Sequence, residues 1–253
     1  MMKMMLCLLL ATSLLGLLTD AALPCGKPKP QARIVGGTDS KVNKLPWQVA
    51  LTEPNMGIPF CSGVLVAPQF VLTAASCVNA KASYDLVLNE HNWQYVNRII
   101  RRKPAEVTVH PDYANGNDYN VALVKLSDGP VMSVPTVCMP TKKLKIHMKS
   151  NTFAAGWGAT EKGGQASPAL QELKVKLMKE CVDDSVDKDV TMCSLDSGLC
   201  SGDEGSPVMM YKKKKHTLVA IASAGGCGDE GALDYYTSVK AEEIREWVDT
   251  VIA

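Results

Sequence analysis

The sequence has almost no net charge, because 27 lysines and arginines face 26 aspartates and glutamates. A near-neutral chain has no general attraction to nucleic acid, so nucleic-acid partners are not expected. The sequence also lacks Cys-x-x-Cys pairs and His–Cys clusters, which are the spacings typical of zinc sites. It contains no Asn-x-Ser/Thr sequence, so N-linked glycan is not expected. The composition therefore implies no metal and no cofactor.

Long apolar runs are absent after residue 22. Before that point, Lys3 precedes an apolar run at 4–18, and the small residues Ala21 and Ala22 follow. This arrangement predicts a secretory signal peptide over residues 1–22. The competing interpretation is a membrane anchor, but the run is shorter than the roughly 20 apolar residues that a span needs. We therefore expect a secreted, extracellular protein with no membrane span.

The cysteines point to the same compartment. Of nine cysteines, Cys7 falls in the predicted signal peptide, and eight remain for the mature chain. An even number in an oxidising compartment predicts disulfides. The remaining length of about 220 residues suits one large all-β domain or two small fused barrels.

Local patterns support a β-rich fold that ends in a helix. Short apolar-rich runs such as 47–51 and 60–66 are separated by Pro, Gly and Asn, which predicts strands joined by turns. Near the C-terminus, Ile244, Trp247 and Val251 recur at helical spacing, which predicts a terminal α-helix.

The most informative stretch is residues 200–207, which read Cys-Ser-Gly-Asp-Glu-Gly-Ser-Pro. It resembles the Cys-x-Gly-Asp-Ser-Gly-Gly-Pro loop of trypsin- and chymotrypsin-like serine proteases. Residues 156–158 (Gly-Trp-Gly) and 117–126 are similar to further motifs of this family, and the resemblance covers about residues 25–253. It implies an all-β fold of two six-stranded antiparallel β-barrels with a C-terminal α-helix.

The family's catalytic positions hold other residues here. In that family a serine is the nucleophile, a histidine is the general base, and an aspartate orients the histidine. These positions fall on Glu204, Ser76 and Asn120. A glutamate has no hydroxyl to attack with, and a serine does not accept a proton near neutral pH. Asp118, two residues before Asn120, is interpreted as a surface charge. The resemblance thus implies an inactive homologue that is not an enzyme.

A zymogen-like cleavage site precedes the domain. Arg33 is followed by Ile34 in a sequence that resembles the activation site of trypsin-like zymogens. In such zymogens the new Ile ammonium pairs with the buried aspartate of the catalytic loop, here Asp203. The resemblance implies a short propeptide at 23–33, a homologue domain at 34–253, and a trypsin-like protease that cleaves between them. The alternative is an ordinary loop before a strand.

The substrate side of the site is also changed. Gly198 stands at the base of the family's primary specificity pocket, and Asp234 replaces a glycine of its wall. An acidic wall would attract Lys or Arg, giving a pocket that binds without cutting. The candidate binding pocket consists of Gly198, Gly202, Ser223, Gly225 and Asp234.

Four consecutive lysines, Lys212, Lys213, Lys214 and Lys215, form a charge run between two apolar segments. This position predicts a hairpin tip. One interpretation is a patch that binds an anionic surface, and the other is a set of solvated lysines without a partner.

The resemblance also implies four disulfides. They are Cys25–Cys138, Cys61–Cys77, Cys181–Cys193 and Cys200–Cys227.

Three functions remain open. The first is a secreted, non-catalytic homologue that binds a protein partner or an anionic surface, acts in a proteolytic or immune cascade, and is switched by cleavage after Arg33. The second is an unconventional or residual serine-type endopeptidase. The third is a decoy that sequesters protease inhibitors or substrates.

Overall fold

The structure is a computed structural model in which residues 23–28, 44–54, 57–95, 99–146, 150–179, 181, 183–195 and 198–253 are described. The predicted signal peptide (1–22) and the predicted cleavage site at Arg33 and Ile34 lie outside the described residues. Within the described ranges, no helix is long and apolar enough to cross a membrane.

The first sheet consists of seven antiparallel strands. They are β1 (Gln48–Thr52), β2 (Pro59–Ala67), β3 (Phe70–Thr73), β4 (Asp85–Leu88), β5 (Ile100–Arg102), β6 (Pro104–Val109) and β7 (Ala122–Leu126). Their order across the sheet is β5-β4-β1-β2-β3-β7-β6. The two edge strands β5 and β6 are separated in sequence by Lys103 alone, so one bent segment bridges both edges and the sheet curls into a half-barrel. This bend explains why seven strands occur where six were predicted.

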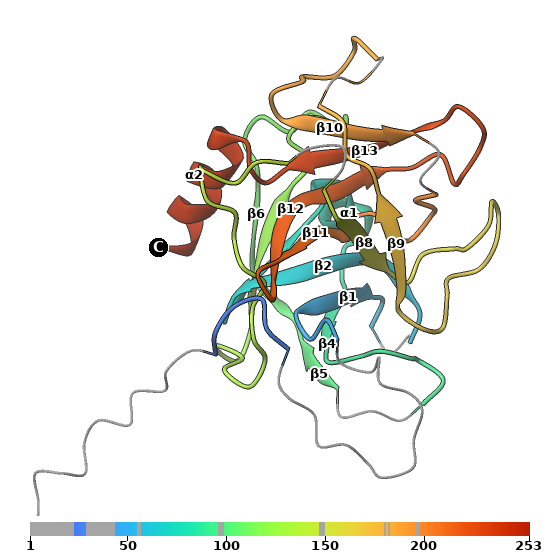
Figure 1. Cartoon of the computed structure of the whole chain (residues 1–253). Coiled ribbons are helices and arrows are strands. Elements are labelled where there is room, and N and C mark those ends of the chain that lie inside the picture. Colours follow the sequence, from blue (N-terminus) through green and yellow to red (C-terminus); the bar gives the residue numbers. More distant parts are fainter. Residues whose placement is uncertain are drawn as a thin grey trace, which may run out of the picture.

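The second sheet has the six strands that were predicted. They are β8 (Thr152–Gly156), β9 (Gln171–Val175), β10 (Thr191–Leu195), β11 (Pro207–Lys212), β12 (Lys215–Ala224) and β13 (Leu233–Ser238). Their order is β10-β13-β12-β11-β8-β9. In Figure 1 these strands occupy the upper half of the molecule, and β1, β4 and β5 occupy the lower half.

The two sheets pack against each other through fully buried side chains. The indole N–H of Trp47, just before β1, donates a hydrogen bond to Met209 Sδ in β11 at 3.1 Å. The neighbouring Gln48 donates its Nε2–H to the carbonyl oxygen of Ala155 in β8 at 2.9 Å. Buried polar groups are stable when they are hydrogen-bonded in this way. The contacts fix the start of β1 against the second sheet.

A C-terminal helix, α2 (Glu242–Ile252), confirms the prediction from helical spacing. Ile244 and Val248 are fully buried, and the Trp247 ring lies 5.0 Å from the ring of His110. Figure 1 shows α2 beside β6. Two glutamates in the first turn of α2 also interact favourably with the helix dipole.

All four predicted disulfides are confirmed. The bridges join Cys25 to Cys138, Cys61 to Cys77, Cys181 to Cys193 and Cys200 to Cys227. A native disulfide typically stabilises a fold by about 2–4 kcal/mol. The chain thus has the predicted all-β architecture, namely two curled antiparallel half-barrels and a C-terminal helix.

Candidate functional site

The three degenerate catalytic positions lie at the junction of the two sheets. Ser76 is in the short helix α1 (Ala75–Ala80), Asn120 precedes β7, and Glu204 lies in the loop before β11. That loop presses directly on the first sheet. The N–H of Ser62 in β2 donates to the carbonyl oxygen of Glu204 at 2.8 Å. A Cβ placed on Gly205 would lie 2.1 Å from the Ser62 carbonyl oxygen, so the close approach needs glycine there.

Ser76 and Asn120 form a mutual hydrogen-bonded pair. The backbone N–H of Ser76 donates to Asn120 Oδ1 at 2.9 Å, and Asn120 Nδ2 donates to Ser76 Oγ at 3.2 Å. Asn120 also donates to the hydroxyl of Ser223 in β12 at 2.8 Å, and Ser223 donates to Asn117 Oδ1 at 3.3 Å. These four side chains are uncharged at any pH near neutrality. The network therefore contains no side chain that titrates near neutral pH, which a general base would need to do.

Glu204 turns its carboxylate back onto its own loop. Its Oε2 accepts the backbone N–H of Gly202 at 2.9 Å. In the serine protease template, that glycine N–H and the N–H of the nucleophile position stabilise the oxyanion. The Glu204 carboxylate therefore lies on a donor that a reacting carbonyl would need, and it carries the same charge as the oxyanion.

Asp203, the neighbouring residue, faces the opposite way into the protein. Its Oδ1 accepts the N–H of Gly158 at 2.9 Å, and its Oδ2 accepts the N–H of Cys200 at 3.1 Å. The pKa of this carboxyl is raised from 3.8 to about 6: burial is the largest cause, the two N–H bonds act against it, and the nearby charges of Glu204 and Asp234 add to it. A cation placed beside Asp203 would favour the charged carboxylate and lower its pKa.

Two glycines of the second sheet make room for Asp203. A Cβ on Gly156 would lie 2.4 Å from Asp203 Oδ1, and a Cβ on Gly158 would lie 2.3 Å from Asp203 Cγ. Beside them is a cavity of about 210 Å³ whose lining includes Asp203, Gly198 and Leu199. The cavity is larger than a single water needs. The Asp203 carboxyl is thus part of the wall of this cavity.

Two residues of the candidate binding pocket, Asp234 and Gly225, lie against the backbone at Leu199. Asp234 has 1% of its surface exposed, and its carboxylate accepts the N–H of Gly226 at 2.8 Å and that of Leu199 at 3.3 Å. A Cβ on Gly225 would lie 2.2 Å from the Leu199 carbonyl oxygen, so the two walls of the pocket touch. Gly198 lines the cavity next to Asp203 instead. The negative charge of Asp234 is therefore directed at the protein's own backbone.

Asp118, interpreted from the sequence as a surface charge, fastens a loop. Its Oδ1 accepts the hydroxyl of Thr191 at 2.6 Å, and its carboxylate accepts the N–H of Asp187 at 3.0 Å. The interpretation missed this role because the partners lie some seventy positions away in the chain.

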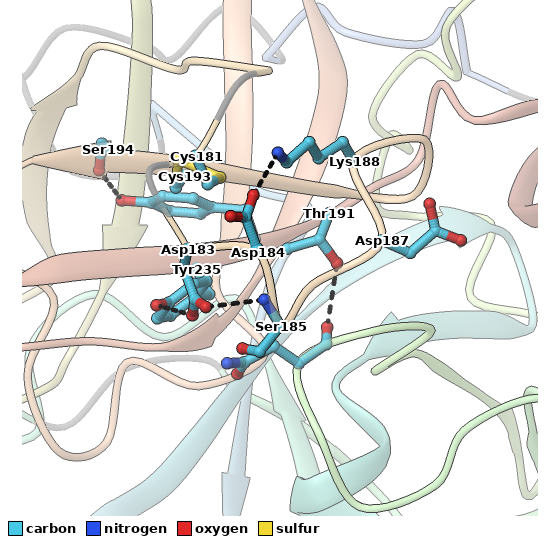
Figure 2. The surroundings of a disulfide bond; sticks show 12 residues. Cys181, Asp183, Asp184, Ser185, Asp187, Lys188, Thr191, Cys193, Ser194 and Tyr235 are labelled. Carbon is cyan, nitrogen blue, oxygen red and sulfur yellow. Dashed lines mark hydrogen bonds and ion pairs between the residues drawn. A yellow bond between two sulfur atoms is a disulfide. The ribbon is translucent and has the colours of Figure 1, made fainter.

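The same loop contains further acidic residues beside the Cys181–Cys193 disulfide. Figure 2 shows Asp183 accepting hydrogen bonds from the hydroxyl of Tyr235 and the N–H of Ser185. These bonds, the Tyr235 hydroxyl foremost, hold the pKa of Asp183 at about 2. Across the described part of the chain, no group of three or more His, Cys, Asp or Glu residues is placed to hold a metal ion.

The four lysines form the predicted hairpin tip. Lys212 in β11 pairs with Lys215 in β12, and all four side chains are exposed. Lys213 and Lys214 form a two-residue turn with φ values of +52° and +60°. Such turns favour Asn and Gly, because both central residues are left-handed.

Comparisons with known proteins agree with this geometry. A family model described as Trypsin matches residues 34–248. Among curated proteins, the chain is similar to Transmembrane protease serine 11G of Rattus norvegicus, with 30% identity over 234 residues that cover 86% of this chain and 55% of that protein. The chain thus spans about half the length of this relative. With two curled β half-barrels, four matching disulfides and a family match over most of its length, the chain belongs to the trypsin family.

Proposed function

We propose that this protein is a secreted, non-catalytic member of the trypsin family that binds a partner and is switched by cleavage after Arg33. The observation that carries the proposal is the hydrogen bond from the Gly202 N–H to Glu204 Oε2, at 2.9 Å. It supports loss of acyl transfer for two reasons. The donor is already occupied, and a carboxylate beside a developing oxyanion would raise the energy of the transition state.

The neutral network around Asn120 supports the same proposal. General-base catalysis needs a group within hydrogen-bond reach of the nucleophile whose pKa lies near the working pH. The side chains that surround Ser76 here are Asn120 and, one step further, Ser223. Neither meets that requirement. Removing the nucleophile and the base together leaves the fold without its usual chemistry.

Retention of the Asp203 pocket supports the switch. Two glycines and two backbone N–H bonds hold Asp203 in place, although the catalytic positions next to it have changed. A freed Ile34 ammonium entering the adjacent 210 Å³ cavity would neutralise a carboxylate that burial now disfavours. The ordered loop at 198–206 would then present a partner surface. Secretion agrees with four disulfides, which persist in oxidising compartments.

The first test is an activity assay on the purified protein, before and after limited cleavage at Arg33. A mixed peptide library measures turnover, and an active-site serine probe measures labelling. We expect neither in either form. The matched variants are Glu204→Ala and, as an exposed carboxylate remote from the site, Glu106→Ala. Turnover that Glu204→Ala abolishes and Glu106→Ala leaves intact would contradict the proposal and establish an unconventional hydrolase.

The second test addresses the switch by amide hydrogen exchange. Cleavage after Arg33 is expected to increase protection in the loop at 198–206, because the new ammonium orders the residues bonded to Asp203. An Arg33→Gln variant exposed to the same protease is the control and should show no change. Equal protection in the cleaved and uncleaved wild-type protein would remove the switch from the proposal while leaving the first test unaffected.

A decoy that sequesters inhibitors is the alternative binding role. It requires an open primary pocket, and Gly225 is instead packed on Leu199. Tight binding of peptidic protease inhibitors to the cleaved form would favour it.

A further inference from the structure

A second cleft opens on the outer side of the second sheet. It has a volume of about 610 Å³, which lies within the range of about 300–1,000 Å³ that small-molecule sites occupy. Its walls come from β8, β9 and the β11–β12 hairpin, together with Pro28 and Lys44 from the N-terminal part of the chain. We call it the aromatic–lysine cleft, after the two kinds of side chain described below.

Three rings form one wall of the aromatic–lysine cleft. The ring of His216 lies 4.7 Å from that of Tyr211 and 5.8 Å from that of Phe153. His216 is 5% exposed, and its burial lowers its pKa, so the ring is neutral at physiological pH. Tyr211, by contrast, exposes 46% of its surface. The exposed ring of Tyr211 beside the partly buried ring of Phe153 suits a planar or apolar ligand body.

Three lysines and one glutamate give the cleft lining a net charge of +2. Lys44 pairs with Glu172 at 2.7 Å, so these two charges largely cancel. Among the residues that the structure describes, neither Lys174 nor Lys214 makes an ion pair. The uncompensated positive charge of the cleft therefore lies on these two side chains.

The backbone places the two lysines next to the rings. Lys174 in β9 is the direct cross-strand partner of Phe153 in β8. Lys214 occupies the second position of the left-handed hairpin turn and lines the cleft. Its neighbour Lys213 occupies the first position and does not line the cleft. Of the two adjacent lysines of the turn, Lys214 therefore lines the cleft and Lys213 does not.

We propose that the aromatic–lysine cleft binds an aromatic oxyanion, meaning a ring that carries a sulfate, phosphate or carboxylate. The ring packs against Tyr211 and Phe153, and the oxyanion accepts hydrogen bonds from the ammonium groups of Lys174 and Lys214. This function is independent of acyl transfer, because none of the degenerate catalytic positions lines the cleft. It also narrows the role of the lysine run, since Lys214 is the one lysine of the four that the cleft uses.

The experiment is a calorimetric titration of the full chain with three matched probes. Phenyl sulfate carries both a ring and an anion, methyl sulfate carries the anion alone, and benzyl alcohol carries the ring alone. We expect phenyl sulfate to bind at least about fivefold more tightly than either of the others, because each part contributes a separate contact. Equal affinity for phenyl sulfate and methyl sulfate would overturn the proposal.

Variants then locate the site. Lys174→Gln and Lys214→Gln are each expected to weaken phenyl sulfate binding about fivefold. Their matched controls, Lys176→Gln and Lys213→Gln, are exposed neighbours outside the cleft and should leave affinity unchanged. Tyr211→Leu should remove the advantage of phenyl sulfate over methyl sulfate. Thermal unfolding checks that every variant is folded.

Further outcomes identify the source of the ligand and test for a diffuse charge effect. Tighter binding of a sulfotyrosine peptide than of phenyl sulfate would support the proposal with a protein as the source, and the reverse order would support a free small molecule. Binding of a sulfated polysaccharide without measurable binding of phenyl sulfate would overturn the proposal. An equal loss in Lys213→Gln and Lys214→Gln would overturn it too.

Discussion

Two adjacent residues of one loop, Asp203 and Glu204, lie in environments that differ in almost every respect. Asp203 faces inward, is bonded to two backbone N–H groups, and has a pKa raised to about 6. Glu204 turns back along the loop onto the N–H of Gly202. The first residue matches the trypsin-family pattern, and the second departs from it.

The difference teaches which part of the site tolerates change. Around Asp203 the geometry is crowded, because Gly156 and Gly158 leave no space for even a methyl group. Around Ser76 and Asn120, uncharged side chains form hydrogen bonds with one another and with the backbone. The Asp203 pocket is therefore constrained by sterics, whereas Asn120 is held by hydrogen bonds.

The largest test of this comparison is the pH dependence of stability. A folded-state pKa of about 6 against 3.8 in the unfolded chain means that the folded state holds the proton more tightly. The contribution of Asp203 to the free energy of unfolding of the uncleaved protein should therefore fall by about 2–2.5 kcal/mol as pH rises from 4 to 7. Chemical denaturation at pH 4, 5, 6 and 7 measures it. Asp203→Asn retains every other titrating group and should show a flatter profile, and identical profiles would contradict the prediction.

A steric test comes next. Gly158→Ala should lower the free energy of unfolding by about 2 kcal/mol, because its Cβ would meet the Asp203 carboxyl. Gly116→Ala is the matched control, since its Cβ would have no neighbour within 4 Å, and we expect a change within about 0.5 kcal/mol. Similar losses in both variants would show that the Asp203 pocket is not sterically tight.

The neutral network supplies a third, smaller effect. Asn120→Ala should cost about 1–2 kcal/mol, because it leaves the buried partners of Asn120 without their hydrogen bonds. The pH dependence of stability between pH 4 and 7 should stay as in the wild-type protein. Asn79→Ala, at an exposed position of α1, serves as the control. A changed pH profile in Asn120→Ala would mean that the network contains a titrating group.

The smallest expected effect links the two regions. The charge of Glu204 raises the pKa of Asp203, but burial is the larger cause. Glu204→Gln should therefore lower the pKa of Asp203 by less than about one unit. To measure the pKa of Asp203, the free energy of unfolding is compared with and without Asp203→Asn as a function of pH, in the wild-type and in the Glu204→Gln background. The midpoint of that difference reports the pKa of Asp203 in each background. Glu106→Gln should leave that midpoint unchanged, and a larger shift in Glu204→Gln would mean that charge outweighs burial.

Much of the fold could be predicted: local patterns indicated the strands and the terminal helix, and the resemblance to the serine protease family implied the two barrels and the disulfide pairing. All four disulfides and the terminal helix are confirmed. The first sheet has seven strands and not the predicted six, because a bend at Lys103 divides one segment into β5 and β6 at the two edges. A bend at a single residue does not change the apolar pattern of a sequence enough to be predicted from it.

The site was harder to predict because its contacts depend on where side chains point. The sequence identifies Glu204 as a changed position, but the choice of Gly202 N–H as its partner depends on the side-chain conformation. In the same way, Asp234 suggests an acidic pocket in the sequence. In the structure its carboxylate accepts the backbone N–H groups of Gly226 and Leu199. The sequence pointed to the lysine run as a candidate anion-binding patch but not to the aromatic–lysine cleft, because the cleft's rings and lysines come from four separate strands and the N-terminal part of the chain.

The Cys25–Cys138 bridge has a consequence for how processing would be detected. The N–H of Gly26 also donates to the carbonyl oxygen of Thr136 at 2.8 Å, and the carbonyl oxygen of Gly26 accepts the N–H of His216 at 2.9 Å. Backbone hydrogen bonds therefore hold this segment in addition to the disulfide. A protein cut after Arg33 would consist of two chains that remain joined by this disulfide. Its intact mass would rise by one water molecule, its mobility on a non-reducing gel would stay the same, and a short peptide would appear after reduction. The N-terminal fragment would also keep Pro28 in the wall of the aromatic–lysine cleft.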